Sequence, residues 1–194
     1  MSKKLEIEKF EMNKSVEAEL KVIYWFFAYP DLKITLSELS LELGIAKATA
    51  NRIVKKLVKK EFLNLEQIGK AWRICSNKAN ILNKTLKISY NLSLVYSTDI
   101  IRKIYSKIGH PKVIILFGSY RKGDDNEKSD LDIAVEVAGN QEHKVIHLED
   151  LKEFGYRRNV PVQVHVFSRN KIDLNLFANI ANGIVVDGFL EVRP

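Results

Sequence analysis

The stretch VIILFGSYRKGDDNEKSDLDIAVEV, residues 113–137, decides the fold of the second half of the chain. It opens with a short apolar run, which predicts a buried strand, and Gly118 and Ser119 then predict a tight turn. A polar loop follows, and a second apolar run predicts another strand. Asp130 and Asp132 stand two residues apart where this strand begins, so strand alternation turns both carboxylates toward one face.

Two carboxylates opposite a small turn suit a metal-nucleotide site. Mg²⁺ prefers oxygen ligands and is usually held by one or two carboxylates together with substrate phosphates. A glycine turn that leads into a helical segment lets phosphates approach free backbone N–H groups. Arg121 and Lys122 follow the turn, where cations would offset phosphate charge. An ordinary loop role for these two residues is equally open.

These residues resemble the polymerase-beta-like nucleotidyltransferase superfamily, in particular its minimal nucleotidyltransferase members. The shared features are the apolar strand, Gly118-Ser119, a spacer of this length, and Asp130-Leu131-Asp132 at the head of the next strand. The resemblance implies that the turn holds a nucleoside triphosphate, as ligand or substrate, and that the catalytic acids Asp130 and Asp132 bind Mg²⁺. The plainer alternative is local, because Asp, Ser and Gly gather in loops for their turn chemistry alone.

The third predicted strand, within RNVPVQVHVFS, departs from this family. Active members carry a third acid on that strand, whereas the candidate positions here hold Gln163 and His165. Neither side chain replaces a carboxylate as a ligand for a hard cation. Two carboxylates are still expected to hold one metal-nucleotide, but a two-metal displacement would be impaired. His165 could accept a proton as a general base, so the presence of catalysis stays open.

Further elements complete the prediction for this half. Helices are predicted over residues 98–108, 143–158 and 169–181, the first capped by Thr98 and the last by Ser168. Residues after Gly183 predict a final extended segment. On the third strand, four valines at alternate positions predict one buried face.

Net charge differs between the two halves of the chain. The 194 residues carry 31 basic and 24 acidic side chains, a net charge of +7. Residues 1–97 hold 17 of the basic and 10 of the acidic side chains, while residues 98–194 hold 14 of each. All the net positive charge therefore lies in the first half, which points to a polyanionic partner there.

Cysteine content and apolar runs bear on the cellular setting. Cys75 is the only cysteine, so no intramolecular disulfide is expected and a reducing, cytoplasmic setting is the simplest interpretation. The longest apolar run, residues 22–29, is too short to cross a bilayer, so no membrane partner is expected. The histidines lack a Cys/His metal spacing, and His143 and His147 are interpreted as surface residues.

The first half predicts three helices followed by a β-hairpin. A helix starts after a charged arm (1–14) and ends at Pro30, and a second starts at the capping box of Thr35 and Glu38. A third covers residues 46–60, and alternating residues on either side of a Gly-Lys turn predict the hairpin. This order resembles the winged helix-turn-helix domain of bacterial and archaeal regulators.

The third helix has one apolar stripe and one basic face, and it contains no acidic residue. The resemblance implies a recognition helix in the major groove of double-stranded DNA. Basic residues would mostly contact phosphates, while Thr49, Asn51 and Arg52 are better placed for bases. The candidate DNA-binding residues on this helix and on the wing are Lys47, Ala48, Thr49, Asn51, Arg52, Lys55, Lys70 and Arg73.

The prediction is therefore an α+β protein with a winged helix-turn-helix (15–76), a connecting helix (77–97) and a small mixed α/β nucleotidyltransferase-like domain (98–194). The leading hypothesis is a DNA-binding transcriptional regulator that binds Mg²⁺-NTP. One alternative is an active nucleotidyltransferase that transfers NMP to a protein or small hydroxyl acceptor, in the manner of an antitoxin. Another is a pure protein-interaction module, since this fold is widely reused. A homodimer is compatible with each of them.

Overall fold

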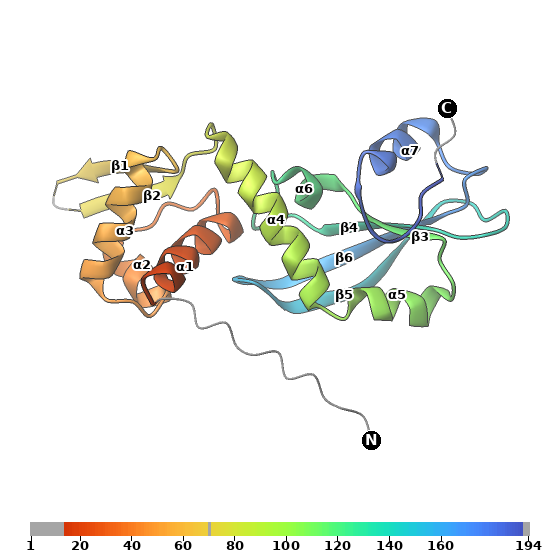
Figure 1. Cartoon of the computed structure of the whole chain (residues 1–194), viewed down its shortest axis with the longest axis horizontal. Coiled ribbons are helices and arrows are strands. Elements are labelled where there is room, and N and C mark those ends of the chain that lie inside the picture. Colours follow the sequence, from red (N-terminus) through yellow and green to blue (C-terminus); the bar gives the residue numbers. More distant parts are fainter. Residues whose placement is uncertain (1–13, 70, 192–194) are drawn as a thin grey trace, which may run out of the picture.

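The computed structural model describes residues 14–69 and 71–191, which form seven helices and two sheets. The N-terminal part is a three-helix cluster with a two-stranded antiparallel hairpin, in the order that the sequence predicts (Figure 1). Except for Lys14, the first residue of the first helix, the predicted arm lies outside the described residues. The elements of this part are α1 (Lys14–Ala28), α2 (Leu36–Glu42), α3 (Lys47–Lys59), β1 (Leu63–Ile68) and β2 (Ala71–Ser76).

Local signals set the boundaries of these helices. The Thr35 side chain accepts a hydrogen bond from the Glu38 backbone, and Glu38 accepts one from the Thr35 backbone, so the predicted capping box is confirmed. Three residues of α3 at helical spacing, Ile53, Val54 and Leu57, enter a core that α1 lines with aromatic side chains. Ala50 of α3 is also buried, whereas Ala46, just before the helix, is exposed.

A long helix, α4 (Ile81–Ser97), connects this part to a five-stranded sheet (Figure 1). The sheet has the order β5-β6-β4-β3-β7, in which only β4 and β6 run parallel among the neighbours. Its short helices are α5 (Ile100–Ile108), α6 (Gly118–Lys122) and α7 (Leu174–Ala181). Its strands are β3 (Val113–Leu116), β4 (Leu131–Glu136), β5 (Lys144–Phe154), β6 (Arg157–Phe167) and β7 (Ile184–Gly188).

The two faces of the sheet are covered by different helices. Alternate residues of β3, β4 and β6, including the predicted valine face, pack in a core with α4 and α5. The opposite residues pack in a smaller core with α7, around Ile115, Ala134 and Phe167. Figure 1 shows α5 and α7 on opposite sides of the sheet. Asp132 alternates with the buried Leu131 and Ile133, so it lies on the α7 face.

The predicted helix over residues 143–158 is wrong, because these residues form β5 and its turn into β6. Leu148, Leu151 and Phe154 are three residues apart and turn inward, which imitates the spacing of a helix. The register with β6 shifts between His147 and Glu149, which accounts for the step from Leu148 to Leu151. The order of elements in this half is therefore helix, strand, short helix, three strands, helix and strand.

Two predicted helix starts are also wrong. Thr98 ends α4, where its hydroxyl donates to the Val95 carbonyl at 2.7 Å, and α5 begins after Asp99. The last helix begins at Leu174 instead of 169, and Asp173 caps it by accepting from two backbone N–H groups. Ser168 instead accepts a hydrogen bond from the Gln141 backbone at 3.0 Å.

Within the described residues, no helix is long and apolar enough to cross a bilayer.

Candidate functional site

The candidate site lies where β3 ends and α6 begins, beside the start of β4. Gly118 has a positive φ of 69°, and a side chain added there would overlap the Asp132 carboxylate. The Phe117 backbone N–H also donates to the Asp132 carbonyl at 3.2 Å. The structure therefore packs the glycine turn directly against one of the two predicted acids.

The flanking residues leave this end of the sheet accessible. Asp130 immediately precedes β4 and Ser119 follows Gly118 on α6, and both are half-buried. Asp132 retains 30% exposure of its side chain. Because Leu131 enters the core, strand alternation places Asp132 on the α7 face, and Asp130 lies just before the strand.

A pocket of about 230 Å³ adjoins Gly118 between α6 and α7. Arg121 and Lys122 line it from α6, so the two cations predicted beside the turn face a cavity. Asn179 of α7 and Asn182, just after it, line the other side, and no local pattern in the sequence identifies either of them. The pocket therefore brings a glycine turn, two cations and two amides to one place, a chemistry that suits an anionic ligand.

His165 is the side chain of β6 that approaches the acids. Its Nε2 lies 3.8 Å from Oδ1 of Asp132, and its Nδ1 lies 3.2 Å from Nε2 of His143. Gln163 is the register partner of Asp132 on the same face. Burial and the neighbouring His165 lower the pKa of the His143 imidazole. His143 is therefore not simply a surface residue, and only the hairpin pairing of β5 with β6 could have identified it.

The donor set fits a metal that arrives with its nucleotide. Within residues 14–69 and 71–191, no three His, Cys, Asp or Glu side chains are arranged to hold a metal ion by themselves. Asp130 and Asp132 can supply two carboxylate oxygens, and phosphate oxygens and water would complete the coordination.

The loop between α6 and Asp130 is held by a buried ion pair. Lys87 of α4 contacts the Asp125 carboxylate at 3.0 Å, and both side chains are at most 4% exposed. Asn91 donates to the same carboxylate at 2.7 Å. Burial lowers the pKa of the Lys87 ammonium and raises the pKa of the Asp125 carboxyl, and each partner offsets part of the other's shift. This pair fixes the loop to the connecting helix.

The same loop borders the N-terminal part. A cavity of about 260 Å³ is lined by Phe26 and Phe27 of α1, by Lys87 of α4, and by Asp124 and Asp125 of the loop. Asp31, which follows α1, accepts a hydrogen bond from Asn126 at 3.4 Å and pairs with Lys78. The segment that carries the acids is therefore in contact with the N-terminal helices.

A second candidate surface is the outer face of α3. Lys47, Ala48 and Lys55 are exposed, and the Lys55 ammonium lies 5.8 Å from the centre of the Trp72 ring on β2. Arg73 is exposed on the hairpin. Thr49 and Asn51 are half-buried, and Lys70 lies outside the described residues.

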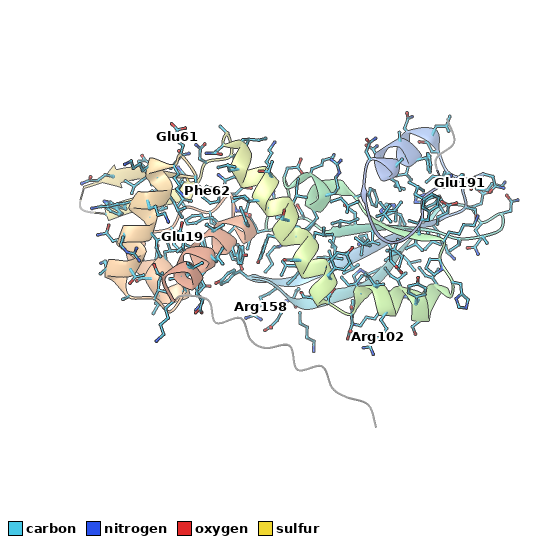
Figure 2. All side chains as sticks on the ribbon, in the orientation of Figure 1. Glu19, Glu61, Phe62, Arg102, Arg158 and Glu191 are labelled. Carbon is cyan, nitrogen blue, oxygen red and sulfur yellow. The ribbon has the colours of Figure 1, made fainter. Side chains whose placement is uncertain are left out.

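Two basic side chains of α3 turn toward α1. The Arg52 guanidinium donates to the Ser15 hydroxyl at 3.0 Å, and the Lys56 ammonium contacts the Glu19 carboxylate at 2.6 Å. Glu19 is labelled on α1 in Figure 2. The acid on α1 offsets the charge of Lys56, which the sequence of α3 alone did not reveal. Arg52 is a predicted base contact, and its hydrogen-bond partner among the described residues is a neutral hydroxyl.

Comparison with known proteins identifies the class of the second half. Residues 98–185 match the family model described as nucleotidyltransferase domain. These residues include Gly118, Ser119, Asp130 and Asp132. The chain therefore carries a nucleotidyltransferase domain over this range.

Two solved structures show a weaker likeness, and no curated protein matches the sequence. One is a proposed ICLR transcriptional regulator from Silicibacter sp. TM1040, with a TM-score of 0.30 and 22% identity over 53% of this chain and 39% of that chain. The other is a proposed transcriptional regulator from Rhodococcus sp. RHA1, with a TM-score of 0.31 and 22% identity over 56% and 41%. This chain thus spans about two fifths of either protein.

Proposed function

We propose that this chain is a DNA-binding regulator whose second half binds a metal-bound nucleoside triphosphate. A winged helix-turn-helix (15–76) would be joined through a connecting helix (77–97) to a nucleotidyltransferase domain (98–194). The observation that carries the proposal is the packing of Gly118 against the Asp132 carboxylate, beside a pocket with two cations. Phosphates would meet the turn and the cations, while Asp130 and Asp132 would hold the metal.

The DNA-binding role is supported by the basic face of α3 and its hairpin. Lys47, Lys55 and Arg73 are exposed on neighbouring elements, as phosphate contacts require. Thr49, Asn51 and Arg52 are the proposed base contacts of a recognition helix. Lys70 and Ala48 complete the proposed surface.

The nucleotide would regulate DNA binding if both ligands favour the same conformer of the chain. A ligand shifts the equilibrium between two conformers only when it binds one of them more tightly. The loop from Gly123 to Asp130 supports this link, because it joins the turn to the acids and also contacts α4 and the end of α1. A bound triphosphate would order the part of the loop near the turn and the acids. Its contacts with α4 and with the end of α1 would transmit this change to the N-terminal part.

The test is a DNA titration of the full chain with and without Mg²⁺-ATP, followed by fluorescence anisotropy. The expected result is a change in DNA affinity that Asp130→Ala abolishes. An unchanged affinity, together with an Asp130→Ala variant that behaves as the unmodified protein, would reject nucleotide sensing. Transfer of labelled nucleotide to a protein in a lysate would instead identify the chain as an active nucleotidyltransferase.

A further inference from the structure

We propose that Asp132 and His165 form a mixed oxygen and nitrogen site for a divalent first-row transition ion, which enters on the phosphates of the nucleotide. This inference rests on the proposed nucleotide-binding function and names the metal that this function uses. The preferred ion would then be one that accepts an imidazole ligand, and not Mg²⁺.

The position of His165 follows from the register of the sheet. β4 and β6 pair in parallel, with Ala134 beside His165 and Asp132 beside Gln163. The partner of His165 is therefore an alanine, whose methyl group leaves the imidazole room to lean along the strand toward Asp132. The ring of Phe117, at the end of β3, packs edge-on against the imidazole with centroids 5.0 Å apart.

The orientation of the imidazole is fixed by His143. The two rings are stacked with centroids 5.4 Å apart, and His143 Nε2 lies 3.2 Å from His165 Nδ1. When His165 Nδ1–H donates to His143, its Nε2 lone pair is left facing Asp132. Histidines that bind metals usually donate their other ring N–H to a carboxylate, a carbonyl or water, which sets the tautomer and the ring angle, and the His143 nitrogen would take that place here.

The spacing between the two side chains fits an ion between them. The 3.8 Å from His165 Nε2 to Asp132 Oδ1 is longer than a hydrogen bond. Two bonds of about 2.1 Å to one ion span up to roughly 4 Å. His165 and Asp132 keep 18% and 30% of their side chains exposed, so the gap is shielded yet open to a ligand.

The choice of ion follows from the donor types. Mg²⁺ takes oxygen ligands almost exclusively, whereas Mn²⁺, Co²⁺ and Zn²⁺ also accept imidazole nitrogen, with affinities that rise along the series to copper. Two protein ligands are too few for a resident metal, which agrees with the lack of any three-ligand cluster in the described residues. Phosphate oxygens and water would supply the remaining positions.

The experiment measures binding of a non-hydrolysable ATP analogue to the full chain by calorimetry with Mg²⁺, Mn²⁺ or Co²⁺, and the visible absorption of the Co²⁺ complex. We expect Co²⁺ to support nucleotide binding at least about tenfold tighter than Mg²⁺, with absorption bands typical of a nitrogen ligand. His165→Gln should remove this advantage and shift the bands, because an amide replaces the imidazole nitrogen. His143→Ala should weaken Co²⁺-dependent binding about tenfold, as expected for an orienting partner.

His110→Ala is the matched control, because His110 is exposed and precedes β3 at the end of the sheet opposite to the turn. It should leave every measurement unchanged. The metal preference of the unmodified protein tests the proposal even where a variant folds poorly. Equal nucleotide affinity with Mg²⁺ and Co²⁺ would overturn the inference and leave the proposed function standing. Absence of nucleotide binding with every ion would overturn both.

Discussion

Gly118 shows how one residue can determine a site. Its φ of 69° lies in the left-handed region, and the space where a side chain would begin is taken by the Asp132 carboxylate. A larger residue would have to change the backbone and displace the acid together. The close approach therefore depends on the lack of a Cβ as much as on the two acids.

Substitution of Gly118 by alanine should affect both stability and nucleotide binding. Backbone strain alone costs about 1–2 kcal/mol in this conformation, and the overlap with Asp132 adds to it. We expect at least a tenfold loss of nucleotide affinity by calorimetry and a lower free energy of unfolding in urea. Gly44→Ala is the control, since Gly44 has a φ of 61° with open space around it. Equal stability losses with unchanged nucleotide affinity would contradict the proposed role.

Lys55 and Lys56 are adjacent but should contribute differently to DNA binding. Lys56 already contacts Glu19, whereas Lys55 lies over the Trp72 ring without an acid among its described contacts. Each phosphate contact contributes about 0.9 to the slope of log K against log salt. Lys55→Ala should therefore reduce the slope by about 0.9, and Lys56→Ala by clearly less, in anisotropy titrations across KCl concentrations. Equal reductions for the two variants would place Lys56 on the phosphates as well.

At the scale of the element, the buried pair of Lys87 and Asp125 ties the loop to α4. A buried ion pair contributes little net stability compared with apolar residues, but loss of one partner leaves an uncompensated charge in the interior. Its two members come from a helix and a loop that lie 38 residues apart. The pair therefore determines where the loop sits relative to the connecting helix.

A double-mutant cycle should expose this coupling. Lys87→Met should lower the free energy of unfolding by about 3–5 kcal/mol, because Asp125 is left buried without its cation. Adding Asp125→Asn should recover part of that loss, as measured by urea unfolding. Lys103→Met is the control, because its pair with Glu149 is partly exposed and should contribute no more than about 1 kcal/mol. Strict additivity in the cycle would show that the pair does not act as a unit.

At the scale of the whole molecule, the turn between β5 and β6 reaches the N-terminal part. The Tyr29 hydroxyl, just after α1, donates to the Tyr156 carbonyl at 2.7 Å. Tyr24 of α1 stacks on Tyr90 of α4 with centroids 4.3 Å apart. Arg158, labelled in Figure 2, lies at the start of β6 beside this turn. His165 lies near the other end of β6. The strand therefore runs from the turn that contacts Tyr29 to the candidate site.

Tyr29→Phe should weaken communication between DNA and nucleotide. The substitution removes one hydrogen bond, worth about 0.5–1.5 kcal/mol, between parts that belong to different proposed domains. We expect a smaller nucleotide effect on DNA affinity while nucleotide affinity alone is unchanged. Tyr96→Phe is the control, since the Tyr96 hydroxyl donates to Val186 between α4 and β7, away from α1. An unaltered nucleotide effect in Tyr29→Phe would exclude this contact from the coupling.

The predictable features of the chain were those encoded over a few residues. The strand, the glycine turn and the paired acids follow from apolar runs and turn residues between 113 and 137. The capping box of α2 follows from Thr35 and Glu38. The prediction failed at β5, because Leu148, Leu151 and Phe154 turn inward at a helix-like spacing that no local rule distinguishes from a helix.

The sequence by itself determined the glycine turn, the two acids and the basic face of α3, because each depends on neighbours along the chain. Tertiary structure alone decided that His143, 22 residues before His165, would lie within 3.2 Å of that imidazole. It also decided that Lys87 would be buried against Asp125, and that Glu19 would offset Lys56. The physical reason is that such contacts depend on strand register and helix packing, which arise from the sum of many burial contacts across the folded chain.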